Sequence, residues 1–199
     1  MLIQNGRMGE WHAWLGTMIN KEKPAAFYDD YYKRTSPLNQ LAMKPIIKYV
    51  ATELKTRKVK AVLDIGCGDG VMLEKCERIG IAGFGFDFSR EAIKACRKHR
   101  GLSRVWVGDA TKAENYISGY DAYLCLEVLE HIENDIGVIM CLRSQSLFIF
   151  SVPSWASKGS SHVRCFGNDN QIRLRYGNLI DIKSIKLFKT RRVVIGRIK

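Results

Sequence analysis

A glycine-rich segment is the part of this chain with the clearest chemical meaning. Residues 62–70 are VLDIGCGDG, so an acid, Asp64, precedes a Gly-x-Gly-x-Gly spacing. Glycines let a backbone turn tightly and approach a ligand closely, because no Cβ intervenes. A dinucleotide fingerprint would need a further glycine at position 71, where the chain has Val71. The spacing therefore predicts a site for a ligand that has no pyrophosphate group, which disfavours NAD.

Two further acids follow apolar runs. Asp87 lies in GFDFS and Asp109 in GDA, each at the expected end of a strand. An acid after the second strand of such a fold accepts hydrogen bonds from ribose hydroxyls. Phe88 is placed to pack against adenine, although it could instead belong to the core. Both acids also precede expected helices, so helix capping is their alternative role.

Two histidines are the candidate general bases, because imidazole titrates near neutral pH. His131 ends the segment ExxEH, in which Glu127, Glu130 and His131 would share one face of a helix. His162 lies in HVRCF, after a later apolar run. We expect Glu130, Arg164 and Trp155 to contact the substrate, and Arg164 to pair either with an anionic group of the substrate or with a nearby acid of the protein.

The elements that must position these residues alternate along the chain. Apolar runs predict strands, and stretches of helical spacing lie between the early ones. This alternation predicts an α/β, Rossmann-like fold with a mostly parallel seven-stranded sheet. The last two strands lack an intervening helix and must form an antiparallel hairpin. The segment Trp155–Asn178 is expected to be a loop. The expected strands are 60–65, 83–88, 104–107, 122–126, 146–152, 179–188 and 192–198, and the expected helices 37–54, 71–79, 90–99 and 134–142.

The size and composition suit one soluble domain. The 199 residues are 46% hydrophobic and 26% charged, and we expect a single domain with an N-terminal arm and helix over 1–57 and a core over 58–199. No apolar run approaches the roughly 20 residues of a membrane span. The N-terminus does not resemble a secretory signal, and six scattered cysteines suit a reducing compartment. A cytoplasmic location follows as an expectation.

The motifs, taken together and in order, resemble those of class I S-adenosylmethionine (SAM)-dependent methyltransferases. VLDIGCGDG resembles motif I of that family almost letter for letter, and YDAYLCLEVLEHI over residues 120–132 resembles its fourth-strand motif in the group similar to ubiquinone-biosynthesis methyltransferases. The resemblance implies that the glycines pass under the methionine part of SAM, and that the N-terminal tyrosines close over it. The residues implied to bind SAM are Asp64, Gly66, Cys67, Gly68, Asp87, Phe88, Asp109, Ala110, Glu127 and Tyr32.

The sequence does not identify the methyl acceptor. We expect methyl transfer to an O or N nucleophile of a small molecule or glycan-like acceptor, because HVRCF is similar to a segment of small methyltransferases that act on such compounds. The net charge of +12, with nine Lys or Arg against the single acid Asp181 after residue 170, leaves RNA as an alternative. A non-catalytic SAM-binding or partner-binding module is a third possibility.

The carboxylates and histidines of Glu127, Glu130, His131 and His162 also suggest a more specific hypothesis, a metal site. The ExxEH segment and a later histidine are similar to the metal ligands of small-RNA 2′-O-methyltransferases, in which a metal lowers the pKa of vicinal hydroxyls. The same segment also occurs in relatives without a metal, and His162 has no second histidine nearby. We therefore expect no metal.

Overall fold

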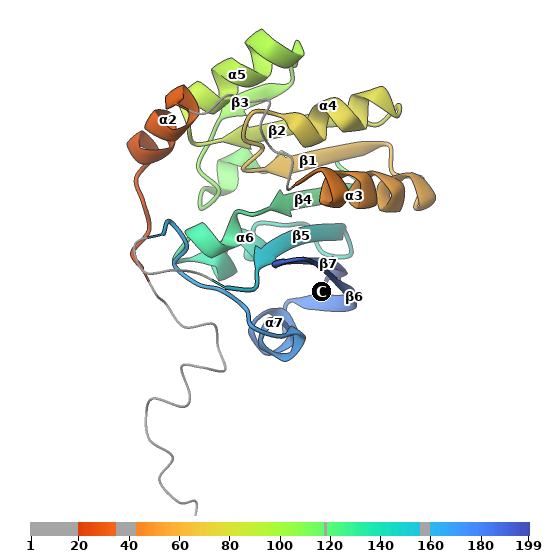
Figure 1. The fold of residues 1–199 in the computed structure, drawn as a ribbon. Coiled ribbons are helices and arrows are strands. Elements are labelled where there is room, and N and C mark those ends of the chain that lie inside the picture. Colours follow the sequence, from red (N-terminus) through yellow and green to blue (C-terminus); the bar gives the residue numbers. More distant parts are fainter. Residues whose placement is uncertain (1–19, 35–42, 118, 156–159) are drawn as a thin grey trace, which may run out of the picture.

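The computed structural model describes residues 20–34, 43–117, 119–155 and 160–199. A seven-stranded sheet in the order β3-β2-β1-β4-β5-β7-β6 runs through its centre (Figure 1). Strands β1 to β5 pair in parallel, and β7 pairs antiparallel with both β5 and β6. The expected Rossmann-like sheet with its antiparallel hairpin is confirmed. The strands are β1 Ala61–Ile65, β2 Ala82–Asp87, β3 Val105–Val107, β4 Ala122–Leu126, β5 Leu147–Pro153, β6 Ile180–Phe188 and β7 Arg191–Ile198.

Side chains alternate between the two faces of the sheet, and both faces are buried. Val62 of β1 packs in one apolar cluster with residues of the helices that follow β1 and β2, whereas its neighbour Leu63 packs in a second cluster on the other face. Parallel strands covered on both faces have nearly continuous apolar sequences, which is why the runs of β1, β4 and β5 were recognisable. The result is a sheet between two layers of helices.

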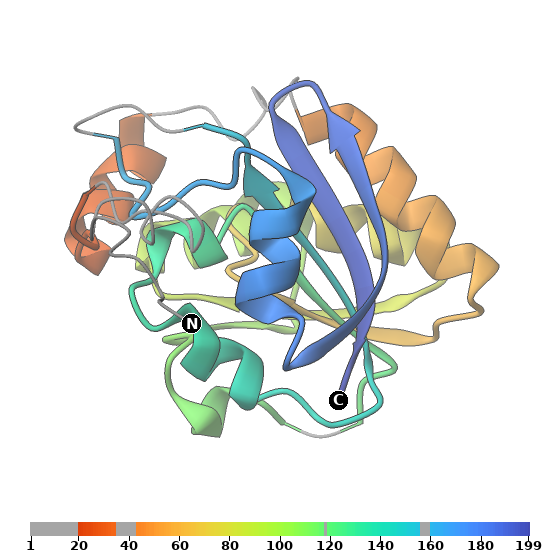
Figure 2. The same ribbon diagram turned by 90° about the horizontal axis from the view of Figure 1, so that it is seen from below.

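The first face carries α3 Lys44–Thr56, α4 Val71–Arg78 and α5 Arg90–Arg100. The opposite face carries α6 Asp135–Met140 and α7 Asp169–Tyr176, together with the short 3-10 turns η2 Ala113–Asn115 and η3 Leu129–His131 (Figure 2). Ser89 caps α5, because its side chain accepts a hydrogen bond from the backbone N–H of Ala92. None of the helices in the described residues is both long and apolar enough to cross a membrane.

The first described helix, α2 Ala25–Arg34, buries no residue completely. It is attached at Asp29, whose Oδ1 accepts hydrogen bonds from Ser89 Oγ at 2.6 Å and from the N–H of Glu91 at 3.2 Å. The segment before it is attached through Glu22 and Glu133, each of which donates its N–H to the other's carboxylate. Helix α2 thus lies across the sheet's carboxyl edge beside α5 (Figure 1).

The expected loop Trp155–Asn178 is wrong, because α7 lies within it. Asn168 caps this helix by accepting from the N–H of Gln171, and the Gln171 side chain accepts from the N–H of Gly167, the residue before the cap. The helix buries only Ile172 and Tyr176, which is too few apolar positions for a helical period to stand out. The helix expected from Pro37 is α3; residues 35–42 lie outside the described part of the chain.

Candidate active site

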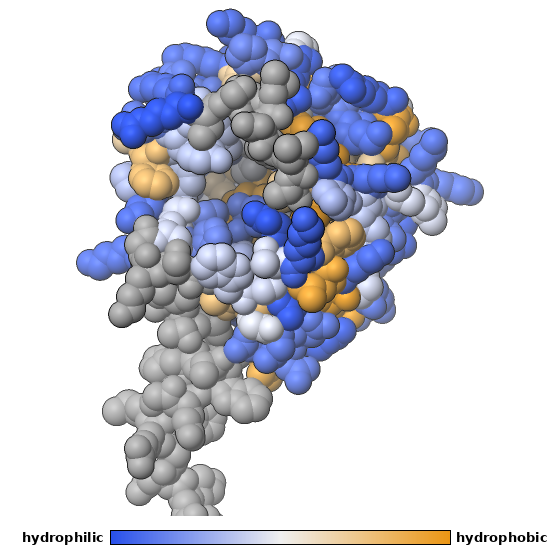
Figure 3. All heavy atoms as spheres, in the orientation of Figure 1, coloured by the Kyte–Doolittle hydropathy of each residue, from blue (hydrophilic) through white to orange (hydrophobic). Residues whose placement is uncertain are grey.

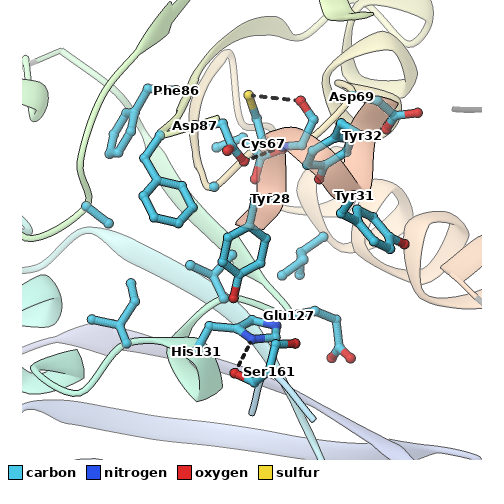
Figure 4. Close-up of a pocket in the computed structure, with 18 of the residues that line it drawn as sticks. Tyr28, Tyr31, Tyr32, Cys67, Asp69, Phe86, Asp87, Glu127, His131 and Ser161 are labelled. Carbon is cyan, nitrogen blue, oxygen red and sulfur yellow. Dashed lines mark hydrogen bonds between the residues drawn. The ribbon is translucent and has the colours of Figure 1, made fainter. Parts of the chain in front are cut away.

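A pocket of about 600 Å³ lies at the carboxyl ends of β1, β2 and β4. The strand order reverses between β1 and β4, which is where open α/β sheets bind their ligands. Helix α2 covers the pocket, and its tyrosines point toward the glycine turn and toward His131 (Figure 4). Twelve of the residues predicted for the site line the pocket: Tyr32, Asp64, Gly66, Cys67, Gly68, Asp87, Phe88, Asp109, Ala110, Glu127, His131 and His162.

The glycine turn after β1 has the geometry that its sequence predicts. Gly66 and Gly68 adopt positive φ angles of 67° and 56°, which other residues rarely adopt. A Cβ on Gly66 would lie 2.5 Å from Val128, and one on Gly68 would lie 2.6 Å from the Tyr32 hydroxyl. Tyr32 of α2 thus lies directly against Gly68 and Val128 against Gly66, so a larger residue at either position would be strained and would displace one of these side chains.

Asp87 connects β2 to the glycine turn. Its Oδ2 accepts a hydrogen bond from the N–H of Gly68 at 3.0 Å, and its Oδ1 accepts one from the N–H of Ser89 at 2.9 Å. Burial raises the pKa of Asp87 to about 6, against these hydrogen bonds, which lower it. Burial and the nearby Asp87 likewise raise the pKa of Asp64 to about 7. The helix cap is Ser89, so Asp87 keeps lone pairs available for a ligand in the pocket.

The part of the pocket that follows β2 and β3 suits a flat, apolar ring. Phe88 lies there with its ring centroid 5.0 Å from that of Tyr28. Asp109 accepts hydrogen bonds through Oδ1 from both the N–H and the hydroxyl of Thr111, each at 2.8 Å. This turn fixes the carboxylate beside Ala110 at the pocket wall.

His131 is held as a neutral imidazole. Its Nδ1 lies 2.9 Å from the carbonyl oxygen of Ser161, and because a carbonyl only accepts, Nδ1 carries the proton and Nε2 has a free lone pair. Desolvation lowers the pKa of His131 to about 4, with a small further lowering from His162. The ring lies on the pocket wall opposite Tyr28 (Figure 4). This arrangement provides a proton acceptor at neutral pH.

Glu130, His131 and His162 form a cluster at the pocket wall, in which the two histidines line the pocket and Glu130 is buried. One ligand atom from each lies within 4.8 Å of the other two, and the two imidazole centroids are 4.9 Å apart. Both carboxylate oxygens of Glu130 and Nδ1 of His162 are buried without a hydrogen-bond partner among the described residues. Such groups are costly unless they are protonated or bind an ion. The donor set therefore fits a divalent cation.

Glu127 is fixed by a residue that the sequence did not single out. It follows β4 with a positive φ of 58°, and its carboxylate accepts from Ser151 Oγ at 2.8 Å and from Arg191 Nε at 2.6 Å. Arg191 also lines the pocket. The expected helical face of Glu127, Glu130 and His131 is wrong, because the helical turn begins only at Leu129. Glu130 is fully buried and outside the pocket lining, with its Oε1 3.9 Å from Nε2 of His131.

The three predicted substrate residues lie outside the pocket lining. Arg164 is 1% exposed and donates to the backbone carbonyls of Leu129, Ile132 and Glu133. Its guanidinium also lies 3.1 Å from the carboxylate of Asp135, so it braces η3 and is not available to a substrate. Trp155 is 59% exposed. We therefore no longer assign Glu130, Arg164 or Trp155 to the acceptor.

Ser161, Arg191 and Asp69 line the pocket without having been predicted. Ser161 contributes a backbone carbonyl, which any residue type could supply, so no sequence signal marks it. Arg191 is one of many basic residues in the C-terminal region. Asp69 could have been noticed, because it lies inside the glycine segment itself.

A family model described as a methyltransferase domain matches residues 37–186. Among curated proteins, the ubiquinone biosynthesis O-methyltransferase of Xanthomonas axonopodis pv. citri is 29% identical over 130 residues, which cover 62% of this chain and 54% of that protein. The enzyme of the same name from Proteus mirabilis is 32% identical over 85 residues, covering 40% and 35%. The matches thus span about a third to a half of these relatives' length.

Solved structures share the fold. The magnesium protoporphyrin IX methyltransferase of Synechocystis PCC 6803, crystallised with S-adenosylhomocysteine (SAH), superposes with a TM-score of 0.68 at 16% identity, covering 87% of this chain and 94% of that one. The methyltransferase domain of a bacterial Hen1 gives 0.62 at 19% identity, covering 79% and 100%. With the family match over most of the chain and the glycine turn, Asp87 and Asp109 around one pocket, the chain belongs to the class I SAM-dependent methyltransferase family.

Proposed function

We propose that the chain transfers the methyl group of SAM to an O or N nucleophile of a small-molecule or glycan-like acceptor. When bound, SAM supplies a methyl group on a positively charged sulfur that is already activated for transfer. The protein must then align the acceptor and, where necessary, accept its proton. The observation that carries the proposal is the neutral His131 on the wall of the pocket that contains the glycine turn.

The pocket residues divide into a cofactor part and an acceptor part. The turn Gly66–Gly68 would hold the methionine part, Asp87 the ribose hydroxyls, and Phe88 with Asp109 the adenine. The remaining wall contains His131, His162 and the Glu127–Arg191 pair. We assign this wall to the acceptor, because it is the part that offers a proton acceptor.

His131 would act as the general base through Nε2. The hydrogen bond from Nδ1 to Ser161 fixes both its tautomer and its orientation, and its lowered pKa keeps it unprotonated at neutral pH. His162 is the alternative base, since its pKa is also lowered by burial and it lies beside His131.

A divalent cation at Glu130, His131 and His162 is the second route to the same reaction. It is favoured by the unpartnered Glu130 carboxylate and by the Nδ1–H of His131, since metal-bound histidines characteristically donate their other N–H to a carbonyl. Such a cation would hold the acceptor oxygen and lower its pKa. This route predicts that chelation by EDTA abolishes turnover and that Mn²⁺ or Mg²⁺ restores it. Full activity in EDTA leaves His131 as a simple base.

A small acceptor is favoured over RNA by how the basic residues are used. Seven of the nine cations after residue 170 have partners within the protein: Arg175 with Asp135, Lys183 with Asp181, Lys186 over the rings of Tyr49 and Phe188, Arg191 with Glu127, Arg192 with Asp169, Arg197 with the Gln145 carbonyl and Lys199 with the Gly177 carbonyl. The face in Figure 3 is mostly hydrophilic but is interrupted by hydrophobic patches. The names of the curated relatives also indicate O-methylation in ubiquinone biosynthesis.

The test measures SAH release with a panel of phenols, alcohols, amines and sugars, beside a generic RNA oligonucleotide. We expect turnover with a panel member and weak, non-productive RNA binding. Salt-dependent RNA binding with SAH release only in its presence would favour the RNA alternative. Binding of SAM without turnover on any acceptor would favour the non-catalytic module. The six cysteines are all free, which suits the cytoplasmic location that we propose.

A further inference from the structure

The glycine turn depends on its neighbours for its shape. Gly66, Gly68 and Gly70 all have positive φ angles, of 67°, 56° and 81°, and glycines lose more conformational freedom on ordering than any other residue. On the sheet side, the turn is fixed by Asp87 and by the bond from the N–H of Cys67 to the carbonyl of Phe86. Its outer side faces α4 and α5.

Arg100, at the end of α5, holds that outer side. Its Nε donates to the carbonyl of Asp69 at 2.7 Å, and its Nη2 lies 2.7 Å from Asp69 Oδ2. Its Nη1 lies 2.6 Å from Oε2 of Glu74, in the first turn of α4. The side chains of Arg100 and Asp69 are 8% and 1% exposed. One guanidinium thus joins the glycine turn, α4 and α5.

The contact requires the geometry of an arginine. A planar guanidinium can reach a carbonyl, a carboxylate and a second carboxylate at once, whereas a lysine ammonium is a point charge on a flexible stem. Removal of one partner from a buried ion pair leaves the other charge uncompensated. The Oδ1 of Asp69 is buried and has no partner among the described residues, so loss of Arg100 would leave a poorly satisfied carboxylate inside the turn.

Asp69 lines the pocket, and Arg100 does not. We infer that Arg100 is a positioning residue for the cofactor: it acts through Asp69 to hold the glycine turn in the shape that accepts the methionine part of SAM. This inference rests on the placement of SAM in the proposed function. The largest effect is expected at the methionine end of the ligand, because Arg100 contacts the turn directly at Asp69, whereas Asp87 is held also by the N–H of Ser89 and Phe88 does not contact the turn through Arg100.

The test compares two ligands by calorimetric titration at a temperature where every variant is folded. SAM carries the methionine part, and 5′-methylthioadenosine lacks its amino acid portion. We expect Arg100→Gln and Arg100→Lys to weaken SAM about tenfold or more, and to change the affinity for methylthioadenosine by less than about twofold. The control is Arg104→Gln, which removes a similar arginine that bonds Gly83 O and Glu77 of α4 but does not reach the turn.

The possible failures are distinct. If SAM and methylthioadenosine weaken equally, or if Arg100→Lys binds SAM as the wild type does, Arg100 does not position the turn and the inference is wrong while the proposed function stands. If the wild-type protein binds neither ligand, the placement of SAM fails and the inference fails with it. Should Arg100→Gln not fold, Arg100→Lys keeps the buried charge and gives the same comparison.

Discussion

Arg191 and Glu127 are far apart in the sequence, yet Nε of Arg191 lies 2.6 Å from Oε2 of Glu127 at the pocket wall. Arg191 begins β7, after the hairpin turn, and Glu127 follows β4. The pair therefore connects the antiparallel hairpin to the parallel half of the sheet at the candidate active site. It also fixes a glutamate that has a left-handed backbone conformation.

This relationship predicts energetic coupling between the two residues. Glu127→Gln and Arg191→Gln should each lower kcat/KM, and the double variant should be no worse than the poorer single variant, with a coupling of about 1 kcal/mol or more. The exposed pair of Lys183 and Asp181, also at 2.6 Å, is the matched control and should show almost no coupling. Additive effects at Glu127 and Arg191 would show that the pair does not work as a unit.

Asp87 should make SAM affinity depend on pH. Its pKa is raised to about 6 by burial, and ribose hydroxyls donate to the carboxylate form. We therefore expect SAM to bind more weakly as the pH falls through about 6, and Asp87→Asn to weaken binding about 10- to 100-fold. Asp87→Asn should also remove the part of the pH dependence near 6, leaving any dependence that comes from Asp64, whose pKa is raised to about 7 by burial and by Asp87. Calorimetry at several pH values measures both effects, with exposed Asp181→Asn as the control. If the affinity of the wild-type protein for SAM does not change with pH, Asp87 does not bind the ribose.

His131 should govern the chemical step without affecting cofactor binding. His131→Asn removes the proton acceptor and should lower kcat about 10²- to 10⁴-fold, with the SAM Kd unchanged. The exposed His99→Asn on α5 is the control. Turnover assays measure kcat, and SAM titrations measure the Kd. If His131→Asn keeps its kcat and His162→Asn loses it, the base is His162.

The same histidine should affect stability in acid. The pKa of His131 is lowered from 6.5 to about 4 in the folded protein, so between these values the unfolded chain binds a proton that the folded protein does not. Its contribution to the free energy of unfolding is therefore present above pH 6.5 and is lost as the pH falls toward about 4. Denaturant titrations across this range should show a shallower pH slope for His131→Asn than for the wild type.

Arg164 should be important for folding and not for acceptor recognition. Arg164→Met removes the buried contacts to η3 and leaves Asp135 with Arg175 as its remaining cation, which should lower the free energy of unfolding by about 3 kcal/mol. Exposed Arg173→Met on α7 should have little effect. Chemical denaturation measures both. If Arg164→Met is as stable as the wild type but has a raised KM for the acceptor, Arg164 binds the substrate after all.

The parts of the molecule that were predictable are those encoded locally. The glycine spacing at 66–70, the acids after β2 and β3, and the apolar strand runs each depend on a few consecutive residues, and the structure places them around one pocket. The Arg191–Glu127 pair and the Ser161 carbonyl depend on tertiary packing, so neither has a local signal. Glu130 was misassigned because helical spacing was assumed where the chain forms a 3-10 turn that starts later. Arg164 was misassigned because a buried arginine and a substrate-binding one look the same in a sequence.

We propose that this pocket aligns SAM with a small acceptor for direct methyl transfer, and that His131 accepts the acceptor's proton. The most direct measurement incubates the protein with SAM labelled in its methyl group and a fractionated cell extract, beside His131→Asn. We expect label to enter the small-molecule fraction with the wild type and to fall by about 10²-fold or more with the variant. Label that enters RNA or protein instead, or that transfers equally well with His131→Asn, would contradict it.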